Sequence, residues 1–414
     1  MFIGLATGLV LGVAANLTLG ASPRLEWFVK HLTEPAGKIF LRLLFMLVIP
    51  LILSALALGV SGLGDLKRLG RIGLKTLAYT VVVSTIAVLI GVGMVNLFKP
   101  GTGLSPALKQ RLAAQASAAP AAAPSSGGTG VDFLVGLVPN NIVKAMGDGD
   151  MLAVMVFALF LGIGLAVTRT ESARRLEEAL EGLYDVVMRL LGMVIQVAPV
   201  GVACLLFTLT ARLGFDVLKQ LGAYVLVVVG ALALHQFGVY SLSVWWLGRM
   251  SPVFFFRSVR DAMVTAFSTA SSNATLPTSL LVAEQNLKLP PHVSRFVLTI
   301  GSTANQNGTA LFEGVTVLFL AQFFGVHLTL AQQITVCFIC VLGGIGTAGV
   351  PAGSIPVVVM ILGMVGIPPE GIGMILGVDR FLDMCRTTLN VTGDLAAAVV
   401  VSRGEAARAP VAGD

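Results

Sequence analysis

The chain has 414 residues, of which 56% are hydrophobic and only 12% are charged, and its mean hydropathy is +0.91. A soluble domain carries about 25% charged residues, so this composition excludes a soluble protein and indicates a polytopic membrane protein. The net charge of +6 does not indicate a nucleic-acid partner, because the basic residues cluster at the ends of apolar segments.

Six apolar runs in the first part of the chain are each long enough for a spanning helix, which needs about 20 apolar residues. They lie near residues 2–20, 36–63, 74–98, 132–168, 182–212 and 218–248. The first predicts a transmembrane helix rather than a signal peptide, because residues 1–22 have no basic n-region. The fourth is interrupted at residues 147–150, and the low-complexity stretch 101–130 predicts a flexible external loop.

Basic residues at the ends of these runs set the orientation. They are Lys67, Arg68, Arg71 and Lys75, then Arg174 and Arg175, then Arg249, Arg257 and Arg260. By the positive-inside rule they mark cytoplasmic loops. The sequence therefore predicts a multi-pass protein of the cell (inner) membrane with both termini in the cytoplasm.

After Arg260 the apolar segments become short and are broken by small and polar residues. The breaks lie at residues 268–277, at 301–309 inside a span of about 293–326, and at 343–354. Irregular backbone at membrane depth survives only where it is buried in protein or lines a watery cavity. The order predicts a re-entrant hairpin, a broken helix, a second re-entrant hairpin and a polar helix. That is the pattern of an inverted repeat, which points to a transporter site at the midplane.

The polar helix, residues 371–403, carries charges in an otherwise apolar segment. At about 100° per residue, one sector roughly 100° wide holds its polar side chains. They are Asp383, Arg386, Thr387, Asn390 and Asp394. One interpretation is a structural salt bridge between Asp383 and Arg386. The other is a site for a zwitterion with an extra acidic group, in which Asp383 holds an ammonium, Arg386 a carboxylate and Asp394 a cation.

Other candidate sites are weaker. Cys337 and Cys340 form a Cys-x-x-Cys without a second pair, which favours small core residues over a metal or redox site. His235 lies within an apolar span and is more typical of a hydrogen-bonded core histidine than of a proton relay. No Gly-x-Ser-x-Gly or His-Glu-x-x-His motif stands in a helical context, so we expect no enzyme. An ion channel would favour a symmetric pore loop over two dissimilar hairpins.

Three motifs resemble the dicarboxylate/amino acid:cation symporter family, which includes the excitatory amino-acid transporters and their prokaryotic relatives. They are Asp383–Asp394 in the last helix, Gly346–Pro351 in the second hairpin tip and Ser271–Pro277 in the first. The resemblance runs from about Ile39 to Arg403. It implies eight transmembrane helices plus two re-entrant hairpins, a homotrimer, and an elevator mechanism in which the second hairpin is a gate.

The resemblance also implies a division of the chain. Residues 1–72 and 132–218 correspond to scaffold helices 1–2 and 4–5, with the external loop at 101–131. The moving part corresponds to helix 3 (73–100), helix 6 (219–255), hairpin 1 (256–290), broken helix 7 (291–327), hairpin 2 (328–369), and helix 8 with the C-terminal tail (370–414).

For the substrate, the family pattern implies that Arg386 binds a side-chain carboxylate and Asp383 an amino group. The remaining expected contacts are Thr387, Asn390, Thr309, Ser272, Val350, Gly353 and Ser354. Members for neutral amino acids lack the arginine and dicarboxylate members lack the carboxylate at 383, so this chain favours L-aspartate or L-glutamate. A second pocket arginine, found in relatives at the positions of Ala270 or Met384, is missing here.

For the coupling ion, one sodium site of the family is degraded, because its aspartate is Asn307 here. Its other ligands fall on Thr80, Val83 and Ser84, and valine cannot bind a hard cation. A second sodium site would use Asp394 with main-chain oxygens of Gly301, Asn305 and Asn390. A third would use only main-chain oxygens of Thr303, Gly344, Ile345 and Thr347. No cofactor is expected.

Glu313 offers a different route for coupling. It lies one helical turn past the broken motif, where proton-cotransporting animal members of the family also have glutamate. Desolvation favours the neutral form of a carboxyl group, which suits a residue that loads and releases a proton. The alternative is a glutamate that is hydrogen-bonded within the bundle. We therefore expect coupling to H+ rather than Na+, with sodium coupling of reduced stoichiometry as the alternative.

Overall fold

The computed structural model describes residues 2–20, 22–62, 71–102, 138–148, 151–168, 170–213, 216–346, 353–368 and 371–403. Across these ranges the chain forms helices and no strand, as the all-α prediction requires. Four of the described helices are long and apolar enough to cross a membrane, or five if the helix that bends by 52° between residues 194 and 196 counts as one span. Much of the predicted loop at 101–131 lies outside the described residues.

The helices of the first half follow the apolar runs. They are α1 (Phe2–Leu19), α2 (Pro23–Phe28), the π-helical turn η1 (Val29–Thr33), α3 (Glu34–Phe45), α4 (Val48–Gly62), α6 (Arg71–Phe98), α9 (Ile142–Asp148), α10 (Met151–Val167) and α11 (Glu171–Leu213). The predicted interruption near residues 147–150 coincides with the end of α9 and the start of α10.

The second half contains more and shorter helices. They are α12 (Asp216–Leu234), η3 (His235–Val239), α13 (Tyr240–Leu242), η4 (Ser243–Leu247), α14 (Pro252–Ser258), α15 (Arg260–Thr269), α16 (Ser272–Leu281), η5 (Val282–Asn286), α17 (Pro291–Ala304), α18 (Asn307–Phe324), α19 (Leu330–Gly346), α20 (Ile355–Met364) and α21 (Ile372–Ser402).

The second span begins earlier than its apolar run. We predicted it at 36–63, whereas a helical path runs from Pro23 to Ser61. Ser22 starts it, because its side chain accepts a hydrogen bond from the backbone N–H of Leu25 at 3.3 Å and Pro23 takes the first helical position. Charged residues within α2 and α3 lower the local hydropathy, so the apolar run alone does not indicate this extension.

The first two predicted breaks are present but narrower than the polar stretches that indicated them, and most of the third, at 343–354, lies outside the described residues. In the first hairpin only Ala270 and Ser271 leave the helical path, with Ala270 in the left-handed region at φ 50°. Ser271 then caps α16 by accepting from the N–H of Ala274 at 3.2 Å. In the broken helix the gap is Asn305 and Gln306. Small polar residues on both sides of each gap remain helical because their neighbours pack around them.

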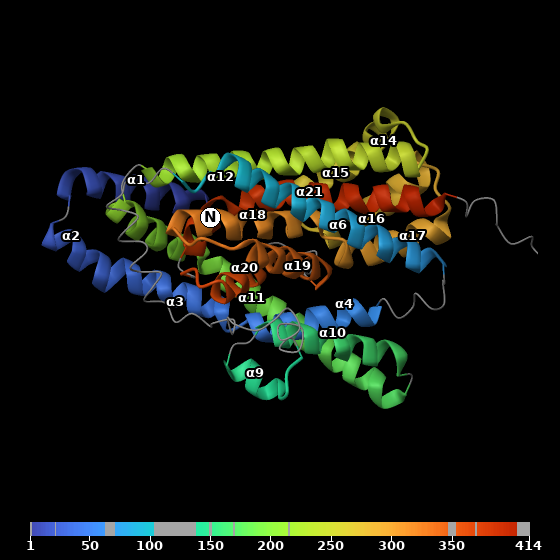
Figure 1. Cartoon of the computed structure of the whole chain (residues 1–414), viewed down its shortest axis with the longest axis horizontal. Coiled ribbons are helices and arrows are strands. Elements are labelled where there is room, and N and C mark those ends of the chain that lie inside the picture. The colour runs from blue at the N-terminus through green and yellow to red at the C-terminus, as the bar shows by residue number, and fades with distance from the viewer. Residues whose placement is uncertain are drawn as a thin grey trace, which may run out of the picture.

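The helices form two groups. In one, α1, α3, α4 and α10 pack against α11 or against each other; in the other, α6, α12 and α15–α19 pack around α21 and α18. Figure 1 shows α18 and α21 in the middle of the second group, with α4 and α10 at the lower edge of the molecule. Contacts of α11 with α21 and of α4 with α19 join the groups.

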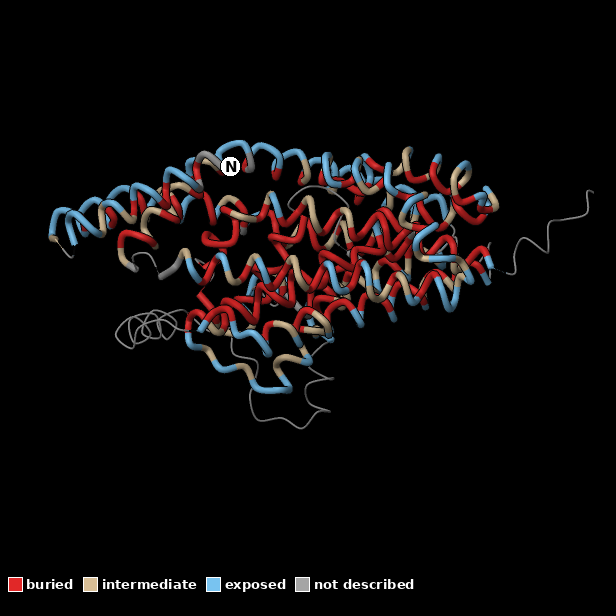
Figure 2. Tube along the Cα trace, turned by 90° about the horizontal axis from the view of Figure 1, so that it is seen from above, coloured by how far each residue is buried: buried red, intermediate tan, exposed pale blue. Residues whose placement is uncertain are grey.

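The core of the bundle is the broken helix. In the most apolar stretch of Pro291–Phe324, 94% of the residues are buried inside the protein, whereas the corresponding share is 39% for Arg71–Phe98 and for Leu218–Leu247. The tube in Figure 2 shows buried residues running through the middle of the bundle and exposed residues along its outer helices. The polar gap at residues 305–306 is therefore surrounded by protein.

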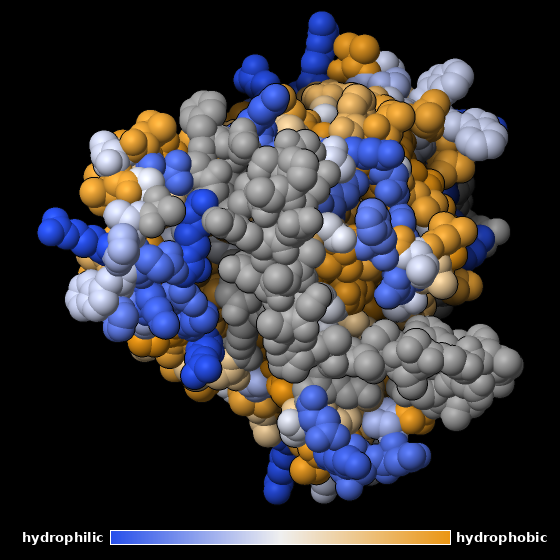
Figure 3. Space-filling model, turned by 60° about the vertical axis from the view of Figure 1, so that its left-hand side comes forward, coloured by the Kyte–Doolittle hydropathy of each residue, from blue (hydrophilic) through white to orange (hydrophobic). Residues whose placement is uncertain are grey.

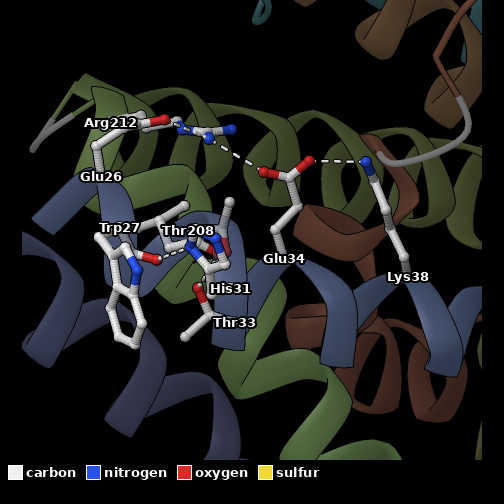
Figure 4. Close-up of polar contacts among 9 residues, drawn as sticks. Glu26, Trp27, His31, Thr33, Glu34, Lys38, Thr208 and Arg212 are labelled. Carbon is white, nitrogen blue, oxygen red and sulfur yellow. Dashed lines mark hydrogen bonds and ion pairs between the residues drawn. The ribbon is translucent and has the colours of Figure 1, made fainter.

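A surface ion chain ties the α2–α3 segment to the end of α11 (Figure 4). The Arg212 guanidinium lies 2.9 Å from Glu26 and 3.0 Å from Glu34, and Glu34 also pairs with Lys38 at 2.7 Å. Beside this chain, the hydroxyls of Thr33 and Thr208 are 2.8 Å apart. Figure 3, in which this end of the molecule comes forward, shows hydrophilic and hydrophobic side chains lying side by side.

Candidate functional site

The centre of the candidate site is a buried arginine between two carboxylates on α21. Arg386 donates from Nε to Asp383 Oδ1 at 3.0 Å and from Nη1 to Asp379 Oδ1 at 3.0 Å. Its Nη2 lies 2.9 Å from Asp383 Oδ1 but makes no hydrogen bond within the described residues. Beneath it, the Phe312 ring centroid is 4.2 Å from the guanidinium carbon, which adds a cation–π contact.

This cluster holds one positive and two negative side chains, all at most 4% exposed. Removing charges from water is costly unless they are paired and hydrogen-bonded. The excess carboxylate and the Nη2 donor without a hydrogen bond mean that the salt-bridge interpretation alone does not account for the cluster. An ammonium group could pair with a carboxylate of the cluster, and a carboxylate could pair with Arg386.

The predicted polar face of residues 371–403 begins at Asp383 and did not include Asp379, although Asp379 is one of the charged residues of that segment. Asp379 precedes Asp383 by one helical turn and therefore lies on the same face of α21, because an offset of four residues turns a helix by about 400°.

Asn390 joins α21 to the gap of the broken helix and to the first turn of α18. Its Oδ1 accepts from the backbone N–H of Gly308 at 2.7 Å, and its Nδ2 donates to Gln306 Oε1 at 2.6 Å and to Thr309 Oγ1 at 3.2 Å. The N–H of Gln306 in turn donates to the carbonyl of Gly344 in α19 at 3.2 Å. Backbone groups freed by a break need such partners when no water is near.

Asp394 contacts the Asn305 side chain and packs against Gly301, whereas the predicted sodium site would use the main-chain oxygens of Gly301, Asn305 and Asn390. Asn305 Nδ2 donates to Asp394 Oδ1 at 2.8 Å, and a Cβ at Gly301 would lie 2.5 Å from the same oxygen, so only glycine fits there. Asn305 Oδ1 is buried with no hydrogen-bond partner in the described chain. Of the third predicted site, Thr347 and the side chain of Ile345 lie outside the described residues, and the Thr303 side chain donates to Ile300 O at 3.0 Å.

Ser84 and Asn307, two of the residues predicted for the degraded sodium site, belong to a neutral hydrogen-bond network. Asn307 Oδ1 accepts from the Ser84 hydroxyl, and its Nδ2 donates to the Tyr240 hydroxyl at 3.0 Å. Thr80 and Val83 are buried on the same helix, α6. Tyr240 could not be found from the sequence, because it is 67 positions from Asn307 and belongs to another helix.

Glu313 is fully buried on α18, and neither of its carboxylate oxygens has a hydrogen-bond partner in the part of the chain that the structure describes. The alternative of a hydrogen-bonded glutamate is therefore wrong for these residues. A Cβ at Gly343 would lie 2.9 Å from Glu313 Oε2, so hairpin arm α19 packs directly on the carboxyl group. A carboxyl group without partners is costly to bury.

The segments predicted as the two hairpins supply further polar groups. The hydroxyls of Ser272, at the start of α16, and Ser354, just before α20, are buried without a hydrogen-bond partner among the described residues. Thr387 and Gly353 are also buried, and Val350 lies outside the described residues. Such groups cost free energy unless something binds them.

His235 differs from its prediction. It is fully buried and its ring stands edge-on to Tyr240 with centroids 4.9 Å apart, but neither ring nitrogen has a hydrogen-bond partner among the described residues. Packing against the tyrosine ring, within the π-helical turn η3, takes the place of the expected hydrogen bond.

Comparison with known proteins places this geometry in a family. Residues 1–404 match the family model described as the sodium:dicarboxylate symporter family. The chain is 34% identical to the proton/glutamate-aspartate symporter of Escherichia coli strain K12, over 97% of this chain and 93% of that protein. It is 32% identical to the proton/sodium-glutamate symport protein of Geobacillus stearothermophilus (97% and 95%) and 32% identical to a C4-dicarboxylate transport protein of an Anaeromyxobacter strain (97% and 90%).

The chain therefore belongs to the sodium:dicarboxylate symporter family. Together with its apolar helices, this makes it a multi-pass membrane protein of a transporter family.

Proposed function

We propose that this protein is a secondary active transporter that imports L-aspartate or L-glutamate, coupled to H+ rather than Na+. The observation that carries the proposal is the buried Asp379–Arg386–Asp383 cluster, whose Arg386 Nη2 makes no hydrogen bond in the described chain. The relatives named above for glutamate and aspartate are consistent with this substrate class.

In this mechanism the substrate replaces one protein contact with another. Its side-chain carboxylate binds Arg386 and displaces Asp383, which then receives the substrate's ammonium group. Asp379 keeps its hydrogen bond from Arg386 Nη1, and together with the Phe312 ring it holds the guanidinium in place. Ser272, Thr309, Thr387 and Asn390, with Val350, Gly353 and Ser354 of the second hairpin, complete the pocket.

Charge arithmetic supports ion coupling. The cluster of one arginine and two aspartates carries a net charge of −1, and an acidic amino acid adds another −1. Moving this excess charge through the membrane is costly unless cations accompany it. Glu313 is a carboxyl group suited to carry a proton, because it is buried and its oxygens have no hydrogen-bond partner in the described chain.

The Asn307 network supports H+ over Na+. A hard cation needs charged or carbonyl oxygen ligands, whereas Asn307 presents an amide already shared between Ser84 and Tyr240. The Asp394–Asn305–Gly301 contact favours the second candidate, sodium coupling of reduced stoichiometry.

For the architecture, we propose eight spans, two re-entrant hairpins and an elevator motion within a homotrimer. The separate packing of the two helix groups supports a scaffold of residues 1–72 and 132–218 and a moving part formed by 73–100 and 219–414. The Ala270–Ser271 turn supports the first hairpin. The basic clusters at 67–75, 174–175 and 249–260 support cytoplasmic termini.

Uptake into proteoliposomes tests the function. We expect saturable uptake of labelled L-aspartate and L-glutamate driven by an acid-outside pH gradient without sodium, and no uptake of succinate, which has no ammonium for Asp383. Uptake that requires sodium and ignores pH would assign the coupling to the Asp394 site. Succinate uptake as fast as that of aspartate would overturn the substrate class.

A further inference from the structure

Two exposed tryptophans lie at the end of the long helical path that starts with α12, the end that the basic residues predict to be cytoplasmic. The span from Leu218 to Leu247 ends with two neighbouring tryptophans, Trp245 and Trp246, which are 63% and 78% exposed. Tryptophan is enriched where hydrocarbon meets the headgroups of a bilayer, because its ring is apolar and its indole N–H is polar. The pair therefore fits the headgroup level.

A tight turn follows and brings α14 beside the tryptophans. Arg249 adopts the left-handed conformation at φ 51°, and the N–H of Met250 donates back to the carbonyl of Val244 at 3.0 Å. In α14 itself Phe255 is buried, whereas Val253 and Phe254 are 62% and 48% exposed. The chain thus places a second pair of apolar side chains on the surface directly after the tryptophans.

Arginines lie close to these apolar side chains along the chain. Arg249, Arg257 and Arg260 are exposed, and Arg403 at the end of α21 donates to the carbonyl of Leu247 at 2.8 Å. The acidic groups nearby do not neutralise them. Asp261 lies 3.7 Å from Arg260 with both side chains mostly exposed, and Glu284 is occupied by Arg295 at 2.8 Å.

We propose that this surface, formed by Trp245, Trp246, Val253, Phe254, Arg249, Arg257 and Arg260, is a binding site for the headgroup of an anionic phospholipid. We refer to it as the tryptophan–arginine corner. The arginines bind the phosphodiester through paired N–H donors, and the four apolar side chains contact the upper acyl chains. Charge complementarity selects this occupant, because an excess of exposed guanidinium groups at headgroup depth attracts anionic lipid.

The corner lies at a junction between helices, so a lipid bound there would act on how these helices are held. It joins the end of the α12 path to the first hairpin, α15 and α16, since α14 packs on both η4 and α15. A bound anionic lipid holds this junction at the membrane surface. The inference concerns lipid binding and does not depend on the transported substrate or on the coupling ion.

The test uses the chain's own fluorescence. The chain has three tryptophans, and two of them lie in the corner, so the variant W27F reports from the corner alone. The full-length W27F protein is placed in phosphatidylcholine liposomes in which an equal, minor fraction is either brominated phosphatidylglycerol or brominated phosphatidylcholine. A brominated lipid that binds at the corner quenches the fluorescence of Trp245 and Trp246.

We expect brominated phosphatidylglycerol to quench more strongly, with a preference of roughly fivefold per arginine at low ionic strength. The preference disappears in W27F carrying R249Q, R257Q and R260Q, and it falls in salt of about 1 M, where the screening length is about 3 Å. The matched control carries R174Q, R175Q and R189Q, which remove the same charge from the exposed arginines of α11 and leave the preference intact.

Three results would overturn the proposal. The first is equal quenching by the two brominated lipids in W27F, which would make the corner an ordinary lipid contact. The second is a preference that survives the three corner substitutions. The third is an equal loss of preference in the α11 control, which would trace the effect to net charge rather than to the corner.

Discussion

The molecule contains two ion clusters of similar composition in opposite environments. The surface chain of Glu26, Arg212, Glu34 and Lys38 has two cations and two anions, with side chains 27–59% exposed. The buried cluster has one cation and two anions, with side chains at most 6% exposed. The surface chain balances its charges, whereas the buried cluster is left with excess charge inside the protein.

The difference separates a structural role from a binding role. Exposed ion pairs contribute about 0–1 kcal/mol each because water and salt screen them. Breaking a buried pair costs about 3–5 kcal/mol, because the remaining charge stays unpaired. A protein gains little stability from a buried cluster with excess charge, so its presence indicates a ligand that completes it.

The largest effect is expected when the buried cation is removed. Arg386→Gln deletes the carboxylate partner, and we expect a loss of about 2–5 kcal/mol of substrate binding, or roughly 30-fold to several thousandfold in affinity. Binding of L-aspartate to the purified protein measures it. The control is Arg212→Gln, for which affinity should stay unchanged. Equal losses in both variants would contradict the contrast between the clusters.

A second large effect is expected at Glu313, which is buried without a hydrogen-bond partner among the described residues. Glu313→Gln keeps the shape but cannot release a proton, so we expect uptake driven by a pH gradient to fall by at least tenfold. Exchange of internal for external aspartate, which needs no net proton movement, should persist. The matched control is Glu284→Gln, an exposed glutamate paired with Arg295. Full proton-driven uptake in Glu313→Gln would remove the role given to this residue.

An intermediate effect is expected for Asp379→Asn. The substitution keeps an oxygen for Arg386 Nη1 but removes the charge, and a hydrogen bond to a charged group is worth about 1.5–3 kcal/mol. We expect KM for L-aspartate to rise by roughly ten- to a hundredfold while the protein stays folded. Because Asp379 positions the arginine, Asp379→Glu should recover part of the affinity. An unchanged KM in Asp379→Asn would show that Asp383 alone orients Arg386.

The smallest effect is expected in the surface chain. Arg212→Gln leaves both glutamates at the exposed surface, so the free energy of unfolding should change by about 1 kcal/mol or less. The change should shrink further as salt is added. Thermal unfolding in detergent at two salt concentrations measures it. A loss of several kcal/mol would place this chain in a less hydrated environment than its exposure indicates.

Much of this arrangement was predictable from local sequence pattern. The polar face of α21 follows from a period of 3.6 residues, and it would have included Asp379 had the count been extended by one turn. The two gaps were found because small polar residues interrupt apolar runs, but their narrow limits depend on caps such as Ser271. Which residues approach each other across the bundle could not be predicted. The contact of Tyr240 with Asn307 depends on how separate helices pack.

Asn307 and Asn390, two of the buried asparagines in the core, differ in how freely evolution can replace them. Asparagine and aspartate codons differ by a single base. At position 390 that change would set a carboxylate against Gln306 Oε1, which cannot turn into a donor because Gln306 Nε2 already donates to Ser302 O at 2.9 Å. At position 307 the Tyr240 hydroxyl can rotate and donate instead of accept. Position 307 is therefore open to a change of charge by one mutation, whereas position 390 is closed to it.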